Sequence, residues 1–162
     1  MDVMNNVATA VELAPRQQKR TRAQVYRERI QIRLAVDEAG PLIAEVLKEN
    51  NIEFPGADWD SGISPHWVIA CEADKVIGCV QIIPAKPFGW LEFLYTSKSA
   101  PYKSRVIAFR KLGEHGLALL KLAGCSCALG TVEPGNKGFL AIIKKYNAIH
   151  VADVALMARR LK

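Results

Sequence analysis

The sequence predicts an α/β domain with a mixed, mostly antiparallel sheet and helices on both faces. Residues 66–72 and 76–83 are apolar runs on either side of a short polar turn, a pattern typical of a β-hairpin. Residues 90–96 and 125–132 are two further apolar strands, separated by a long segment with helical spacing. A connection of that length suits parallel strands joined by a helix, so both kinds of pairing are expected in one sheet.

The elements before the hairpin are a strand and a helix. Residues 30–35 alternate between apolar and polar side chains, as in a half-buried strand. The next segment has one apolar face, and Asp37 is placed to cap a helix there. Asn50 and Asn51 are expected to end this helix. Residues 54–65, rich in Pro, Gly and Asp, form an irregular connection to the hairpin.

The second half of the chain begins with the strand at 90–96, after a loop flanked by two prolines. Apolar spacing predicts a helix over residues 105–123, and Gly124 stands where a helix C-cap belongs. A buried strand, a short helix over residues 138–146 and two short strands within residues 148–161 complete the domain. These elements supply the helices that cover the sheet.

The N-terminal segment differs from the rest of the chain. Residues 1–27 are polar and too charged to join a core, so we expect an extended basic arm there and a domain over residues 28–162. The arm has a narrow apolar stripe followed by the basic residues Arg16, Lys19, Arg20 and Arg22. Such a segment suits docking on an acidic protein surface. We therefore expect partner chains, in an assembly or a homo-oligomer.

Charge is unevenly distributed along the chain. The net charge is +6, with +4 in residues 1–33, −6 in residues 34–99 and +8 in residues 100–162. A basic second half indicates a partner with negative charge, such as coenzyme A phosphates, nucleic acid or an acidic protein. The alternative is a basic surface that contacts only solvent. No nucleic-acid-binding motif is present.

Several classes of protein are disfavoured. No apolar run reaches the roughly 18 residues of a membrane span, and the first residues lack the order of a secretory signal. The four cysteines contain no CxxC pair, and the three histidines lack ligand spacing, so we expect core cysteines in a reducing compartment and no metal site.

The order of elements from Trp90 to Lys162 resembles the cofactor half of the GNAT superfamily of acetyl-CoA-dependent N-acetyltransferases. The resemblance covers about residues 30–162. In that family a glycine-containing loop opens the long helix and holds the coenzyme A pyrophosphate through backbone N–H groups. Here the aligned segment, residues 101–112, contains no glycine, and the family's glycines fall on or beside Arg105, Ile107 and Phe109. These side chains prevent close backbone approach to phosphates.

The resemblance also implies site residues. The cofactor-binding candidates are Lys103, Ser104, Arg105 and Asn136, of which Asn136 aligns with an asparagine that contacts coenzyme A. The family's thiolate-protonating tyrosine aligns with Ile143, which has no proton to give, although a shift of one helical turn brings Tyr146 to that place. Glu92 lies on the strand where many such enzymes keep a general base; an exposed strand carboxylate is the alternative.

Two functions follow from the resemblance. The scaffold is complete while two chemical features are missing, which favours a non-catalytic structural or interaction component that needs no cofactor. Residues 116–125 are similar to small GNAT-like proteins of phages, so a virion is one expected setting and the cytoplasm of a bacterial host the other. The alternative is an active N-acetyltransferase that uses acetyl-CoA.

Overall fold

A computed structural model describes residues 22–53, 66–132, 149–150 and 155–160. The described residues form one seven-stranded sheet in the order β1-β2-β3-β4-β5-β7-β6. The strands are β1 (Ile30–Leu34), β2 (His66–Glu72), β3 (Lys75–Ala85), β4 (Phe88–Thr96), β5 (Cys127–Val132), β6 (Ile149–His150) and β7 (Ala155–Arg160). The helices are α1 (Arg22–Arg29), α2 (Gly40–Glu49) and α3 (Tyr102–Leu122), with a 3-10 turn η1 (Asp37–Ala39) before α2.

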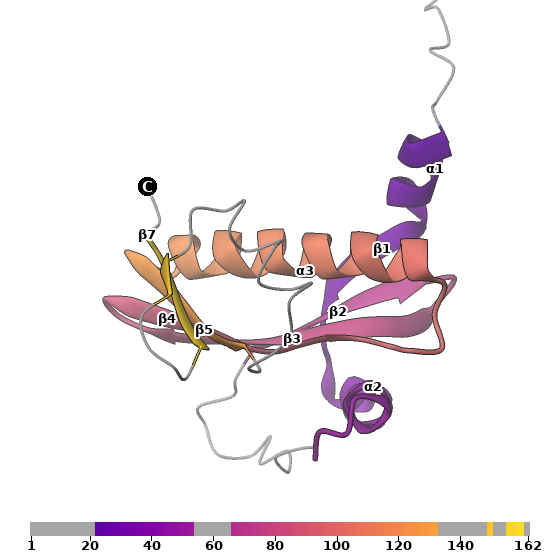
Figure 1. The fold of residues 1–162 in the computed structure, drawn as a ribbon, viewed down its shortest axis with the longest axis horizontal. Helices are drawn as coiled ribbons and strands as arrows, with labels where there is room; N and C mark the ends of the chain where they lie inside the picture. The colour runs from indigo at the N-terminus through magenta and orange to yellow at the C-terminus, as the bar shows by residue number, and fades with distance from the viewer. Residues whose placement is uncertain (1–21, 54–65, 133–148, 151–154, 161–162) are drawn as a thin grey trace, which may run out of the picture.

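The predicted mixed sheet is confirmed. β4 and β5 are parallel and are joined by α3, whereas the other neighbouring strands pair antiparallel. α3 crosses one face of the sheet and α2 lies on the other (Figure 1). The predicted hairpin of β2 and β3 is also confirmed, with a turn at Ala73 and Asp74.

Successive side chains of β2 and β3 point to opposite faces of the sheet, so the core has two layers. Val68 and Val80 belong to the layer under α3, together with the fully buried Leu112 and Leu120 of that helix. Trp67 belongs to the layer under α2. Each layer buries several large apolar side chains, and each such side chain contributes about 1.5–3 kcal/mol. The two helices are therefore held by opposite faces of the same two strands.

Some predicted boundaries are wrong. α2 is capped by Ala39 without a side-chain hydrogen bond, so Asp37 is not its N-cap; the 3-10 turn occupies that position, and Pro41 stands in the first turn of the helix. The loop expected between Pro84 and Pro87 is a tight turn, because β3 runs to Ala85 and β4 begins at Phe88. The end of α2 at Asn50 and the left-handed Gly124 after α3 agree with prediction.

α1 runs across the predicted boundary between arm and domain. It starts at Arg22 and passes directly into β1 at Ile30. The helix projects away from the sheet on the side that α3 covers (Figure 1). The division at residue 27 stays a prediction. Of the basic arm, Arg16, Lys19 and Arg20 lie outside the described residues.

Candidate functional site

The candidate site lies where β4 and β5 stop pairing. Their parallel ladder joins Phe88–Leu91 to Cys127–Gly130. Beyond Leu91, β4 continues to Thr96 and stays paired with β3, while no further pair with β5 is formed among the described residues. The β5 side of the second half of β4 is thus open within that part of the chain, and this opening leads toward the start of α3.

A β-bulge reshapes β4 at the beginning of this opening. Gln81 pairs with Glu92 and Cys79 with Tyr95, so β4 has one more residue than β3 between these pairs. Phe93 lies in this bulge with φ of +50°. Its ring packs on Trp67, and the two ring centroids lie 5.8 Å apart. Bulges turn a strand and redirect its side chains. A bulky residue with positive φ persists only where its surroundings hold it, and the Trp67 contact supplies such support.

Glu92 stands immediately before this bulge, on the strand where the sequence predicted it. Its side chain is half-buried, and the residue faces Gln81 across the β3–β4 pair. Within the described residues no hydrogen bond or ion pair involves its carboxylate. Its role as a general base stays a prediction.

The connection from β4 to α3 is shorter than the sequence indicated. α3 begins at Tyr102, three residues before the expected Arg105, with Pro101 as its N-cap. The first helical hydrogen bond runs from Arg105 N–H to Pro101 O at 3.0 Å. The positions aligned with the family's glycines therefore lie inside the helix. The loop that precedes the helix is Ser97–Pro101, and it too contains no glycine.

The three described cofactor candidates differ in their surroundings. Lys103 is exposed. Ser104 is 1% exposed, and its hydroxyl has no hydrogen-bond partner among the residues that the structure describes. Arg105 is half-buried, and its Nε lies 3.4 Å from Thr96 Oγ1. Lys103 is therefore the candidate whose charge faces solvent, whereas Ser104 offers a ligand only its backbone N–H. Asn136 and Tyr146 lie outside the described residues.

Sequence analysis missed Glu49, which holds the turn in front of α3. Ser97 Oγ donates to Glu49 Oε2 at 2.8 Å, and the N–H of Ser99 donates to the same oxygen at 3.2 Å. Burial raises the pKa of Glu49, but hydrogen bonds from the Ser97 hydroxyl and from the backbone N–H groups of Ser99 and Lys98 outweigh it, and the pKa lies below its ordinary value. The carboxylate is therefore bound as an anion.

A second contact fixes the end of α2 at the same place. Asn50 Nδ2 donates to Thr96 O at 3.1 Å, at the last residue of β4. Together Glu49 and Asn50 attach the end of α2 to the first half of the turn, across more than 40 residues of sequence. No local pattern signals this contact, because a glutamate near a helix C-terminus usually faces solvent.

The architecture corresponds to solved acetyltransferase structures. Ard1 from Thermoplasma volcanium superimposes with a TM-score of 0.67 at 13% identity, covering 83% of this chain and 99% of that one. An N-acetyltransferase from Staphylococcus aureus Mu50 gives 0.66 at 17% identity, covering 82% and 99%. The chain has the GNAT fold. PaiA N-acetyltransferase from Thermoplasma acidophilum, crystallised in complex with coenzyme A, gives 0.64 at 14% identity, covering 82% and 99%.

At these identities the likeness establishes the GNAT fold alone. No family model matches the sequence, and no curated protein matches it either. In the part of the chain that the structure describes, no group of three or more His, Cys, Asp or Glu side chains could hold a metal ion. No helix in that part is long and apolar enough to cross a membrane.

Proposed function

We propose that this chain uses the GNAT fold as a non-catalytic binding or structural component of a protein assembly. The observation that carries the proposal is the carboxylate of Glu49 in the turn before α3. In the resembling enzymes, backbone N–H groups of the loop that opens this long helix hold the coenzyme A pyrophosphate, and the aligned segment here, residues 101–112, directly follows this turn. Here the N–H groups of Lys98 and Ser99 and the hydroxyl of Ser97 bind a carboxylate of the same chain.

An internal carboxylate opposes phosphate binding in two ways. A pyrophosphate that used these donors would first displace Glu49, and each hydrogen bond to a charged group is worth about 1.5–3 kcal/mol. The pyrophosphate would also approach a negative charge, which repels it. The glycine-free loop adds to these costs, since the side chains of Ser97–Pro101 keep a ligand away from the backbone.

The assembly is the finer part of the proposal. The sequence places a basic arm before the domain and an acidic segment in its middle, a division that suits contacts between chains. The arm's basic residues, Arg16, Lys19, Arg20 and Arg22, would contact protein partners. The similarity of residues 116–125 to phage GNAT-like proteins supports a virion as the setting, with the cytoplasm of a bacterial host where the chain is made.

The second candidate is an active N-acetyltransferase with acetyl-CoA as its cofactor. Two observations favour it. β4 and β5 separate beyond Leu91 and Gly130, which opens the sheet beside the bulge. The first turn of α3 has no side-chain cap, and N–H groups at a helix N-terminus attract anions. Structures with this fold have been crystallised with coenzyme A.

Calorimetry with acetyl-CoA separates the two candidates. We expect the full chain to bind acetyl-CoA more weakly than about 1 mM. Glu49→Ala frees the donors of the turn, so its affinity should rise at least about tenfold, or about 1.4 kcal/mol. Glu45→Ala removes the same charge from an exposed position of α2 and is the matched control. It should change the affinity little.

Tight binding of acetyl-CoA in the same experiment would contradict the proposal. A micromolar dissociation constant for the unmodified chain, about −8 kcal/mol, contradicts the proposal and favours the enzyme. Acetyl transfer to a primary amine by the same preparation would establish that activity. An equal gain in both glutamate variants would mean that net charge, and not the occupied turn, limits binding.

A further inference from the structure

The outer edge of β1 has backbone groups that point away from the sheet. Ala35 N–H donates to Trp67 O at 2.8 Å, so the backbone groups of Ala35 face β2. Along an antiparallel pair this direction alternates with each residue. The N–H and C=O groups of Ile30, Ile32 and Leu34 therefore point outward. Lys111 Nζ reaches Ile30 O at 2.7 Å, which agrees with an outward carbonyl at that residue.

This edge ends in exposed apolar side chains. β1 is the terminal strand of the sheet formed by the described residues. Leu34 is 60% exposed and Val36 is 64% exposed, although both are large and apolar. An edge with outward hydrogen-bonding groups and apolar side chains is a template for pairing with another strand. One carbonyl is capped by Lys111, but a carbonyl oxygen has a second lone pair.

We propose that this edge binds the same edge of a second copy of the chain, as an antiparallel β1–β1 pair centred on Ile32. In this register Ile32 faces Ile32 of the second copy, and Ile30 faces Leu34. Residues with outward backbone groups then oppose one another, so they exchange N–H···O bonds across the two-fold axis. The apolar side chains at 30, 32 and 34 meet on the face of the sheet that α3 covers.

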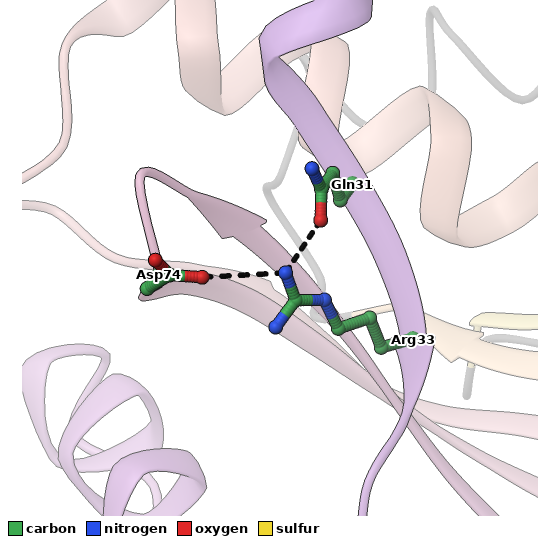
Figure 2. Close-up of polar contacts among 3 residues, drawn as sticks. All are labelled: Gln31, Arg33 and Asp74. Atoms are coloured by element: carbon green, nitrogen blue, oxygen red, sulfur yellow. Dashed lines mark hydrogen bonds and ion pairs between the residues drawn. The ribbon is translucent and has the colours of Figure 1, made fainter.

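The polar side chains of β1 select this register. Figure 2 shows the Arg33 guanidinium between Gln31 and Asp74, and Arg33 Nη2 lies 3.3 Å from Asp74 Oδ1. Centring the pair on Ile32 places Arg33 opposite Gln31 of the second copy, a neutral amide that already accepts its hydrogen bond within one chain. Centring it on Arg33 would oppose two guanidinium groups, which is destabilising.

α1 gives a second reason to expect a partner at this edge. It leads directly into Ile30, so in this register it emerges beside the end of β1 of the second copy, near Leu34. An eight-residue helix is too short to be stable alone, and a neighbouring chain would support it.

The inference rests on the proposed function only in placing the chain in an assembly. Sedimentation velocity of the full chain tests it directly. We expect a concentration-dependent dimer, and Leu34→Lys should weaken it at least about tenfold, because a charge would face the apolar Ile30 of the second copy. Leu42→Lys makes the same change at an exposed position of α2 and should leave the dimer intact. A chain that stays monomeric up to about 1 mM overturns the proposal, as does equal dissociation in both variants.

A cross-link tests the register without relying on Leu34→Lys. Ile32→Cys places its thiols opposite each other on the two-fold axis, within the roughly 7 Å Cα separation that a disulfide tolerates. Arg33→Cys places them two residues out of register, and that variant should resemble the unmodified chain. A dimer that forms no disulfide in Ile32→Cys contradicts the register. The acetyl-CoA titration has an independent readout, so failure of either proposal leaves the other standing.

Discussion

Gly116 and Gly113 of α3 offer a test of how closely this helix packs on the sheet. Both lie in the helix interior, where replacing glycine with alanine favours the helix by about 0.8–1 kcal/mol. Among the described residues, a Cβ at Gly113 would meet nothing within 4 Å, whereas a Cβ at Gly116 would lie 2.6 Å from Leu91 Cδ2. The same substitution should therefore act in opposite directions one turn apart.

The expected magnitudes follow from these distances. Gly113→Ala should raise the free energy of unfolding by about 0.5–1 kcal/mol. Gly116→Ala gains the same propensity but overpacks the contact with Leu91, which costs about 1–3 kcal/mol. The Leu91 methyl is the end of a flexible side chain, so we expect a cost of about 1.5 kcal/mol, in the lower half of that range. After the gain in helix propensity, the net loss is about 0.5–1 kcal/mol.

Urea unfolding followed by circular dichroism measures both changes. A double-mutant cycle with Leu91→Ala isolates the contact: in that background Gly116→Ala should stabilise the chain, since the obstructing methyl is gone. Gly116→Ala that stabilises the unmodified chain as much as Gly113→Ala refutes the reasoning. It would mean that α3 lies farther from β4 than the structure places it.

Two further predictions concern titratable groups. The pKa of Glu49 is lowered in the folded chain, so its contribution to stability is present above its ordinary pKa of about 4.5 and is lost as the pH falls through the lower folded value. Glu49→Gln should therefore lower the free energy of unfolding by about 1 kcal/mol near pH 7, and by less at pH values below the folded pKa. Thermal melts at several pH values measure this loss, with Glu45→Gln as the control. A loss that stays constant across that pH range would contradict the assignment. Burial raises the pKa of Cys79 to about 12, so iodoacetamide at pH 8 should modify the half-buried Cys127 and spare Cys79 until the chain unfolds. Mass spectrometry that finds Cys79 labelled as fast as Cys127 in the folded chain would show that the α2 layer opens readily.

The sequence alone determined the order of the main strands and helices and two of the strand pairings. Apolar alternation in residues 66–83 depends only on neighbouring residues, so the hairpin of β2 and β3 was predictable from it. The parallel pairing of β4 and β5 followed from the length of the segment between them, because a crossover needs a helix of that size. The absence of glycine was also visible in the sequence. It holds both for the aligned segment, residues 101–112, and for the loop Ser97–Pro101 that the structure shows.

Only the tertiary structure decided the details of the candidate site. Glu49 reaches the turn at Ser97 across 48 residues of sequence, and no local pattern encodes a contact of that range. The bulge at Phe93 could not be predicted from the sequence, because no glycine marks it. Packing on Trp67, and not intrinsic backbone preference, holds the positive φ of Phe93. The outward direction of the β1 backbone depends on its register with β2. Local propensity specifies strands and helices, whereas their register and their long-range polar contacts exist only once the chain has folded.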